Sequence, residues 1–235
     1  MKFFLCFFNF TVSVISAQEK EVLVFHKTEG FYHKSIPAGI QAIKELGGEN
    51  GFRVTETKDS ENFSEENLEK YDLVIFLNTT GNVLDKGQQI AFENYMENGG
   101  NFFGIHSAAD TEYEWEWYGW LTGAYFLDHP EIQKAEVHVV AHEHPTVSHL
   151  PETWKRTDEW YNYKNLNPEN KVLLLLDEKS YEGGKNGEVH PIAWFKKLKS
   201  GGISMYTGGG HTEESYVEPL FREHLRRSIL FAMEN

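Results

Sequence analysis

Short apolar segments alternate with helical patterns through the first half of the chain, and this alternation constrains the fold most. The candidate strands are segments 21–25, 52–57, 73–77 and 102–105. Two of them, 73–77 and 102–105, are apolar throughout, as strands buried on both faces are, and Ile36, Ile40 and Ile43 recur at helical spacing between the first two segments. Alternation at this short spacing predicts right-handed crossovers, and therefore a parallel sheet with helices on both faces.

Capping residues predict where two of these helices begin and end. Ser35 stands where it can cap the first helix, which the glycines of segment 47–48 can close. Asp85 and Gln88 have the spacing of a capping box, which places the start of a later helix.

The second half of the chain is less regular. Further strands are expected at 135–140, 171–176, 192–195 and 203–207, followed by a last helix from about residue 218. No linker or composition break divides residues 18–235, so we expect one α/β domain with a mostly parallel sheet.

The stretch at residues 98–110, N-G-G-N-F-F-G-I-H-S-A-A-D, carries the first candidate site. His106, Ser107 and Asp110 follow the predicted end of a buried strand, and segment 108–109 could begin a helix. Ligands of open parallel sheets bind outside the carboxyl ends of the strands. The alternative is a tight turn in which Ser107 or Asp110 caps the next helix.

Polar side chains also follow three other strands. The first strand leads to a loop ending near His33, and the third leads to Asn78 and Thr79, whose polar groups suit a polyol. Near the other end of the chain, Y-T-G-G-G-H-T-E-E brings three glycines and His211 after a further strand. A parallel sheet would bring all these sets to one edge, and this convergence is the argument for a site.

Other polar and aromatic residues allow two interpretations. His129 lies between Asp128 and Pro130 and is a candidate site residue, whereas the histidines of segment 142–149 have no tight zinc spacing and suit a solvated loop. Tyr161, in D-E-W-Y, could contact a sugar or could equally pack at the edge of the core.

The first seventeen residues have the pattern of a secretory signal peptide. Lys2 precedes an apolar run, and small residues before Gln18 favour cleavage there; an uncleaved anchor is the alternative. The single cysteine, Cys6, lies in this segment, so the mature chain would hold no disulfide, thiolate ligand or thiol nucleophile. We expect export, to a bacterial periplasm, with no membrane attachment after cleavage.

Charge and motifs exclude several classes of function. The formal net charge is −14, and no basic stripe offsets it, so nucleic acid is not an expected partner. The chain has no P-loop, no dinucleotide-binding glycine motif and no serine-esterase elbow.

Several motifs together resemble the trehalose-utilisation (ThuA-like) family. They are V-L-V-F-H-K-T-E-G-F-Y-H, F-L-N-T-T-G, G-I-H-S-A-A-D-T-E-Y, D-H-P, T-D-E-W-Y, H-P-I-A-W and Y-T-G-G-G-H-T-E-E-S-Y. The resemblance implies a flavodoxin-like three-layer sandwich of the class I glutamine amidotransferase-like superfamily. It also implies a role in carbohydrate metabolism, for some relatives with disaccharides oxidised to a ketone.

The amidotransferases of that superfamily carry a catalytic cysteine where this chain has His106. Their histidine and glutamate near the C-terminus resemble His211 and Glu213. Glutamine hydrolysis is therefore not expected, although a base and its orienting acid could remain.

Two functions are compatible with these residues. The first is acid–base chemistry on a keto-sugar or disaccharide derivative, with His106 and His211 as base and acid and Glu213 orienting His211. The expected substrate-binding residues are His33, Asn78, Thr79, Ser107, Asp110, His129 and Tyr161. The second is a non-catalytic sugar-binding or accessory protein.

A divalent metal such as zinc is a possible cofactor. Its candidate ligands are His33, His106, His129 and His211, since imidazoles together with a carboxylate form open zinc sites. Metal-free acid–base chemistry is the alternative.

Overall fold

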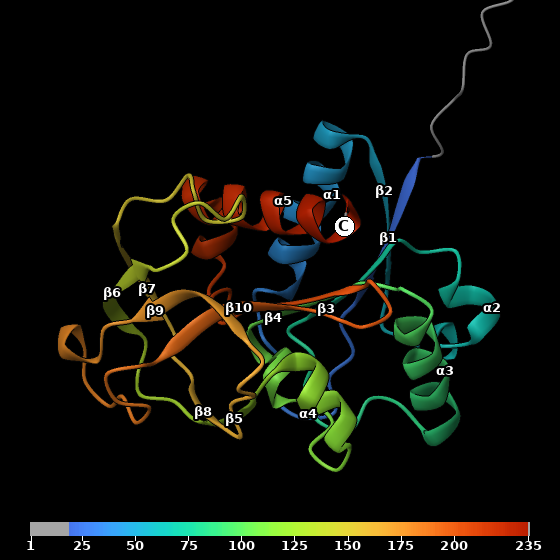
Figure 1. Cartoon of the computed structure of the whole chain (residues 1–235), viewed down its shortest axis with the longest axis horizontal. Helices are drawn as coiled ribbons and strands as arrows, with labels where there is room; N and C mark the ends of the chain where they lie inside the picture. Colours follow the sequence, from blue (N-terminus) through green and yellow to red (C-terminus); the bar gives the residue numbers. More distant parts are fainter. Residues whose placement is uncertain (1–18, 235) are drawn as a thin grey trace, which may run out of the picture.

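The computed structural model describes residues 19–234, which form a three-layer α/β sandwich. A nine-stranded sheet has the order β2-β1-β3-β4-β11-β10-β9-β6-β7, with helices on both of its faces (Figure 1). The predicted fold class is confirmed. The predicted signal peptide, residues 1–17, lies outside the described residues.

One half of the sheet is parallel and the other is antiparallel. The parallel strands are β2 (Phe52–Thr57), β1 (Lys20–Phe25), β3 (Leu73–Leu77), β4 (Phe102–Ile105) and β11 (Ile203–Thr207). The antiparallel continuation consists of β10 (Pro191–Lys197), β9 (Lys171–Leu176), β6 (Gln133–Val139) and β7 (Thr153–Asp158). A separate ribbon pairs β5 (Tyr125–Asp128) with β8 (Asn162–Lys164).

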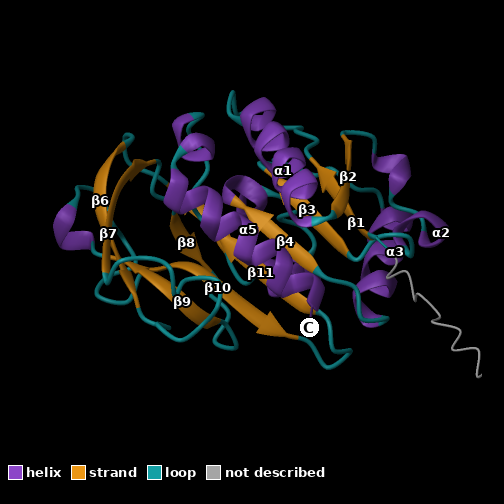
Figure 2. Ribbon diagram, turned by 90° about the horizontal axis from the view of Figure 1, so that it is seen from above, coloured by secondary structure: helices purple, strands orange, loops and turns teal. Residues whose placement is uncertain are grey.

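The helices lie on both sides of the central strands. Helices α1 (Ile36–Asn50) and α5 (Pro219–Glu234) cover one face, and α3 (Lys86–Glu97) and α4 (Glu116–Thr122) cover the other (Figures 1 and 2). The short α2 (Glu65–Leu68) packs on α3. Among the described residues, no helix is both long enough and apolar enough to cross a membrane.

The strand patterns match the burial observed. Every residue of β3, β4 and β11 is buried, because helices cover both faces of these strands. The predicted capping box is confirmed, since Asp85 accepts from the backbone N–H of Gln88, whose side chain accepts from the N–H of Asp85.

Three local predictions are wrong. Ser35 has helical dihedrals and caps nothing; its Oγ donates instead to the Gly210 carbonyl at 3.1 Å. Helix α1 continues past the predicted glycines to Asn50, and Gly51, at φ 75°, ends it. Residues 108–109 do not begin an α-helix but belong to a short 3₁₀ turn, η2 (His106–Asp110).

His224 in α5 gives the fold a predictable sensitivity to acid. It is fully buried, with Nδ1 3.1 Å from the Thr146 carbonyl and Nε2 3.3 Å from Thr207 Oγ1. Burial, together with the smaller effect of nearby His149, Arg156 and His144, lowers its pKa from 6.5 to about 4, against the opposing effect of the bond to Thr146. The unfolded chain therefore binds a proton at a higher pH than the folded chain does, so stability falls as the pH drops from 6.5 through 4.

We expect protonation of His224 to lower the free energy of unfolding by about 3 kcal/mol as the pH falls from 6.5 to below 4. His224→Gln should flatten the pH dependence by this amount in urea unfolding at pH 7, 5.5 and 4. The exposed His142→Gln is the control and should leave the slope unchanged. An identical slope in wild type and His224→Gln would contradict the assignment.

Candidate functional site

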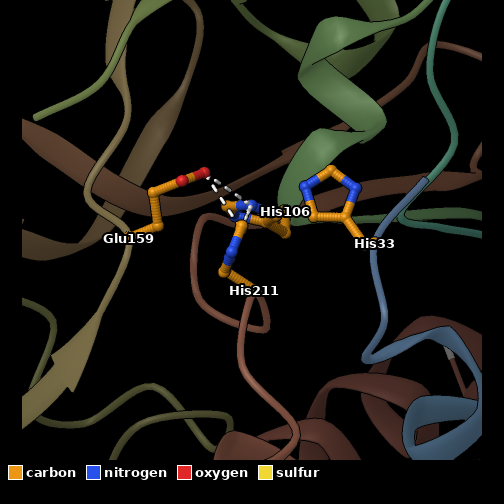
Figure 3. Close-up of side chains that lie close together, drawn as sticks. All are labelled: His33, His106, Glu159 and His211. Atoms are coloured by element: carbon orange, nitrogen blue, oxygen red, sulfur yellow. Dashed lines mark hydrogen bonds and ion pairs between the residues drawn. The ribbon is translucent and has the colours of Figure 1, made fainter. Parts of the chain in front are cut away.

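Three histidines and one glutamate from four separate segments meet at one edge of the sheet (Figure 3). His33 lies between β1 and α1, His106 directly follows β4, Glu159 follows β7, and His211 follows β11. One nitrogen or oxygen atom of each lies within 4.8 Å of those of the others. The site therefore combines the parallel and antiparallel halves of the sheet.

His106 is held rigidly at the end of its strand. It is fully buried and has φ 49°, a left-handed conformation that is uncommon for a non-glycine residue. Its Nδ1 lies 2.9 Å from the Gly208 carbonyl, which can only accept, so Nδ1 carries a proton. Its own carbonyl accepts from the Tyr206 hydroxyl at 2.7 Å. These bonds fix the ring and leave Nε2 for the site.

The remaining nitrogen of His106 faces two other electron-rich atoms. Its Nε2 lies 3.2 Å from His211 Nδ1 and 3.4 Å from Glu159 Oε2, and the latter two atoms are 3.0 Å apart. Three lone pairs so close would repel one another. A proton on His211 Nδ1, or a cation between the three atoms, would balance them.

The carboxylate of Glu159 is ionised. Burial alone would raise its pKa, but its interactions with His106 and His211 lower the pKa well below the usual range. The second oxygen, Oε1, lies 3.2 Å from Nδ1 of the half-exposed His129.

His33 completes the cluster as a neutral imidazole. It is 2% exposed, its Nδ1 lies 3.3 Å from Ser107 Oγ, and its ring stands nearly perpendicular to those of His106 and His211. Burial, followed by the proximity of the other two histidines, lowers its pKa to about 2. It is therefore a lone-pair donor at neutral pH.

A buried aspartate holds the backbone that carries His211. Asp158 accepts from the backbone N–H groups of Gly210 at 2.9 Å and His211 at 3.1 Å, and from Ser215 Oγ at 3.0 Å. Its counter-ion is Arg156, at 3.1 Å. Because Glu159 is the next residue, the same anchor fixes both the carboxylate and the imidazole.

Several residues predicted from the sequence do lie in or beside the cluster. Tyr161 is buried with its ring centre 4.2 Å from that of His106, and it lies 6.0 Å from the ring of His129. Asp110 accepts from the Tyr113 hydroxyl at 2.5 Å, and burial raises its pKa.

Three predicted residues have other contacts than expected. Asn78 is fully buried and donates to Ser35 Oγ and the Gly210 carbonyl, and Thr79 bonds to Thr111, so both hold loops together, and their contact with a ligand stays a prediction. Glu213 is exposed, and Glu159 takes its predicted place against His211.

The clustered side chains that could hold a metal ion include Glu159 and not His129, whose Nδ1 lies beside Glu159 Oε1; whether a metal binds stays a prediction. The strand before it, β7, has a polar sequence, T-W-K-R-T-D, and was not predicted. Its buried positions are Trp154, Arg156 and Asp158, so the sequence shows no apolar–polar alternation that could have placed Glu159 at a strand end.

Comparisons with solved structures define the class to which this fold belongs. The glutamine amidotransferase of Thermotoga maritima is similar in fold, with a TM-score of 0.55, 11% identity, and coverage of 93% of this chain and 100% of that one. The fold is thus of the class I glutamine amidotransferase-like type.

The chain belongs to the ThuA family, described as trehalose utilisation, whose model matches residues 21–232. A ThuA-like protein of Bacteroides uniformis is 26% identical with a TM-score of 0.78, covering 94% of each chain. One from Parabacteroides merdae is 15% identical with a TM-score of 0.74, covering 92% of this chain and 91% of that one. No curated protein is significantly similar in sequence. The family supports a carbohydrate-related role.

Proposed function

We propose that this protein is a carbohydrate-active enzyme that transfers protons on a keto-sugar or disaccharide derivative at a divalent metal centre. The observation that carries the proposal is the convergence of His33, His106, Glu159 and His211 within 4.8 Å. These four side chains are the proposed ligands.

The donor set fits a zinc-like ion. Neutral imidazoles and carboxylates are common zinc ligands, and an ion would balance the lone pairs that meet between His106, His211 and Glu159. If bound by these residues, such an ion would polarise the carbonyl of a ketone substrate and so acidify the neighbouring C–H.

The protein's own residues bind and orient the sugar in this proposal. Asp110 and His129 lie beside the cluster and offer a carboxyl group and a half-exposed imidazole for sugar hydroxyls and for proton transfer. The ring of Tyr161 packs on His106 and lies near His129, so it offers an aromatic surface to the sugar beside the cluster. Glutamine hydrolysis is not proposed, because the strand end carries His106 and the only cysteine of the chain is Cys6.

The decisive experiment measures metal content and turnover of untagged protein together. We expect about one equivalent of divalent metal by elemental analysis, and conversion of a 3-keto-disaccharide, followed by NMR, that stops on chelation and returns with Zn²⁺. His138→Gln is the control and should change neither metal content nor turnover, since it alters the other group of side chains among residues 19–234 that could hold an ion, Glu136, His138 and Asp177.

The other outcomes would select the alternatives. Turnover that survives chelation in protein with substoichiometric metal would replace the metal centre with metal-free chemistry, in which Glu159 orients His211. Sugar binding without turnover over a broad keto-sugar panel would indicate a non-catalytic binding protein.

A further inference from the structure

A cavity lies near the amino ends of β9 and β11, at the opposite end of the strands from the histidine cluster. It has a volume of about 760 Å³, within the usual range of small-molecule sites. Its lining includes Lys196, near the end of β10, which runs antiparallel to β11 and so ends beside the amino end of that strand. His106 and His211 lie beyond the carboxyl ends of β4 and β11. The cavity is therefore separate from the proposed active site.

One wall of this cavity is aromatic. Trp117 and Trp120 of α4 line it, with ring centres 6.3 Å apart and planes inclined at 45°. Trp120 is 40% exposed, and its Nε1 donates to Glu169 at 3.2 Å. A half-exposed indole held in one orientation offers a flat apolar surface to a ligand.

A buried amine points to the charge of that ligand. Lys196 is only 3% exposed, and its Nζ donates to the Trp120 carbonyl, with the Trp120 ring centre 5.0 Å away. An ammonium has three donors, and this carbonyl is its one hydrogen-bond acceptor among the described residues. Burial lowers the pKa of Lys196 to about 7, opposed by Glu169. An anion in the cavity would occupy the remaining donors and stabilise the charged amine.

The other charged residues in the lining favour an anion as well. Lys171, Lys197 and Lys199 join Lys196 in the cavity, against Glu97 and Glu169. This cationic surplus lies in a chain with 36 acidic and 22 basic residues, so it departs from the charge of the molecule as a whole.

We propose that this cavity binds an acidic sugar, a pyranose ring that bears a carboxylate. The apolar C–H face of the ring would pack on the indoles of Trp117 and Trp120, and the carboxylate would pair with Lys196. This site goes beyond the proposed catalytic function and does not depend on it.

The test titrates three probes into the full chain and follows the indole N–H signals by NMR. D-Glucuronate should shift the signals of Trp117 and Trp120 saturably, whereas D-glucose, which lacks the charge, and inorganic sulfate, which lacks the ring, should not. His106→Gln should leave glucuronate binding to this cavity unchanged, because the histidine cluster and the cavity lie at opposite ends of the strands.

Two substitutions test whether Lys196 and Trp120 bind glucuronate. Lys196→Met keeps the length of the side chain and should weaken glucuronate binding at least tenfold, while the exposed Lys58→Met should not. Trp120→Leu should weaken glucuronate binding by a similar factor. This variant still tests the site if Lys196→Met does not fold. Equal shifts with glucose or sulfate, shifts confined to other tryptophans, or unchanged affinity in a folded Lys196→Met or Trp120→Leu variant would overturn the proposal.

Discussion

Glu159→Gln is expected to lower the affinity of the histidine cluster for Zn²⁺ by at least about 100-fold, since loss of outer partners alone costs 10–100-fold. The substitution keeps the size of the side chain but removes its negative charge. That charge lies 3.0 Å from His211 Nδ1 and 3.4 Å from His106 Nε2. Competition with a chromogenic chelator measures the change, and turnover should fall with metal occupancy.

The matched control is Glu213→Gln. Glu213 is the acid that the sequence places next to His211, but it is exposed, so its replacement should leave metal affinity within about twofold, a change of well under 1 kcal/mol. An equal loss of affinity in both variants would show that the effect is not specific to the cluster. An unchanged affinity in a folded Glu159→Gln variant would remove Glu159 from the ligand set.

Arg156→Met is expected to cost about 3–5 kcal/mol of unfolding free energy, because it leaves the buried Asp158 carboxylate without its counter-ion. The methionine stem can keep the contacts that Arg156 makes with the rings of Trp154 and Phe221. For a chain of this size, the loss corresponds to a fall in Tm of about 10 °C, measurable by calorimetry.

A double-mutant cycle separates the lost pairing from the other effects. Adding Asp158→Asn to Arg156→Met should recover part of the loss, since the buried charge is then gone. Arg53→Met is the control, because the Arg53 side chain is 64% exposed and its solvent-screened pairs with Glu19 and Glu21 contribute little to stability. An equally small loss for Arg156→Met and Arg53→Met would contradict the importance of the buried pair.

The parallel half of the fold could be predicted from sequence because its signals are local. Strands buried on both faces must be apolar throughout, and β3 and β4 satisfy this in segments of five and four residues. The start of α1 could not be predicted in the same way. Ser35 has the side chain of a cap, but Gly210, 175 residues away, supplies a tertiary acceptor that outcompetes the local bond.

The candidate site could be predicted only where its residues follow parallel strands. His33, His106 and His211 could be placed together because parallel strands end at one edge. Glu159 follows β7, the outermost strand of the antiparallel half. It reaches the cluster next to Asp158, which accepts from the backbone N–H groups of Gly210 and His211. Nothing local to its sequence distinguishes it from Glu213, which stands only two residues from His211 yet faces solvent.

The joining of distant segments in one cluster has a consequence for biosynthesis. His106 and His211 are 105 residues apart, and Glu159 enters from the antiparallel half. A nascent chain therefore cannot assemble these side chains until β11 has left the ribosome and paired with β4, its neighbour in the sheet. Since contacts of such long sequence separation form slowly, the cluster is completed late in folding. Its assembly thus reports that both halves of the sheet have joined.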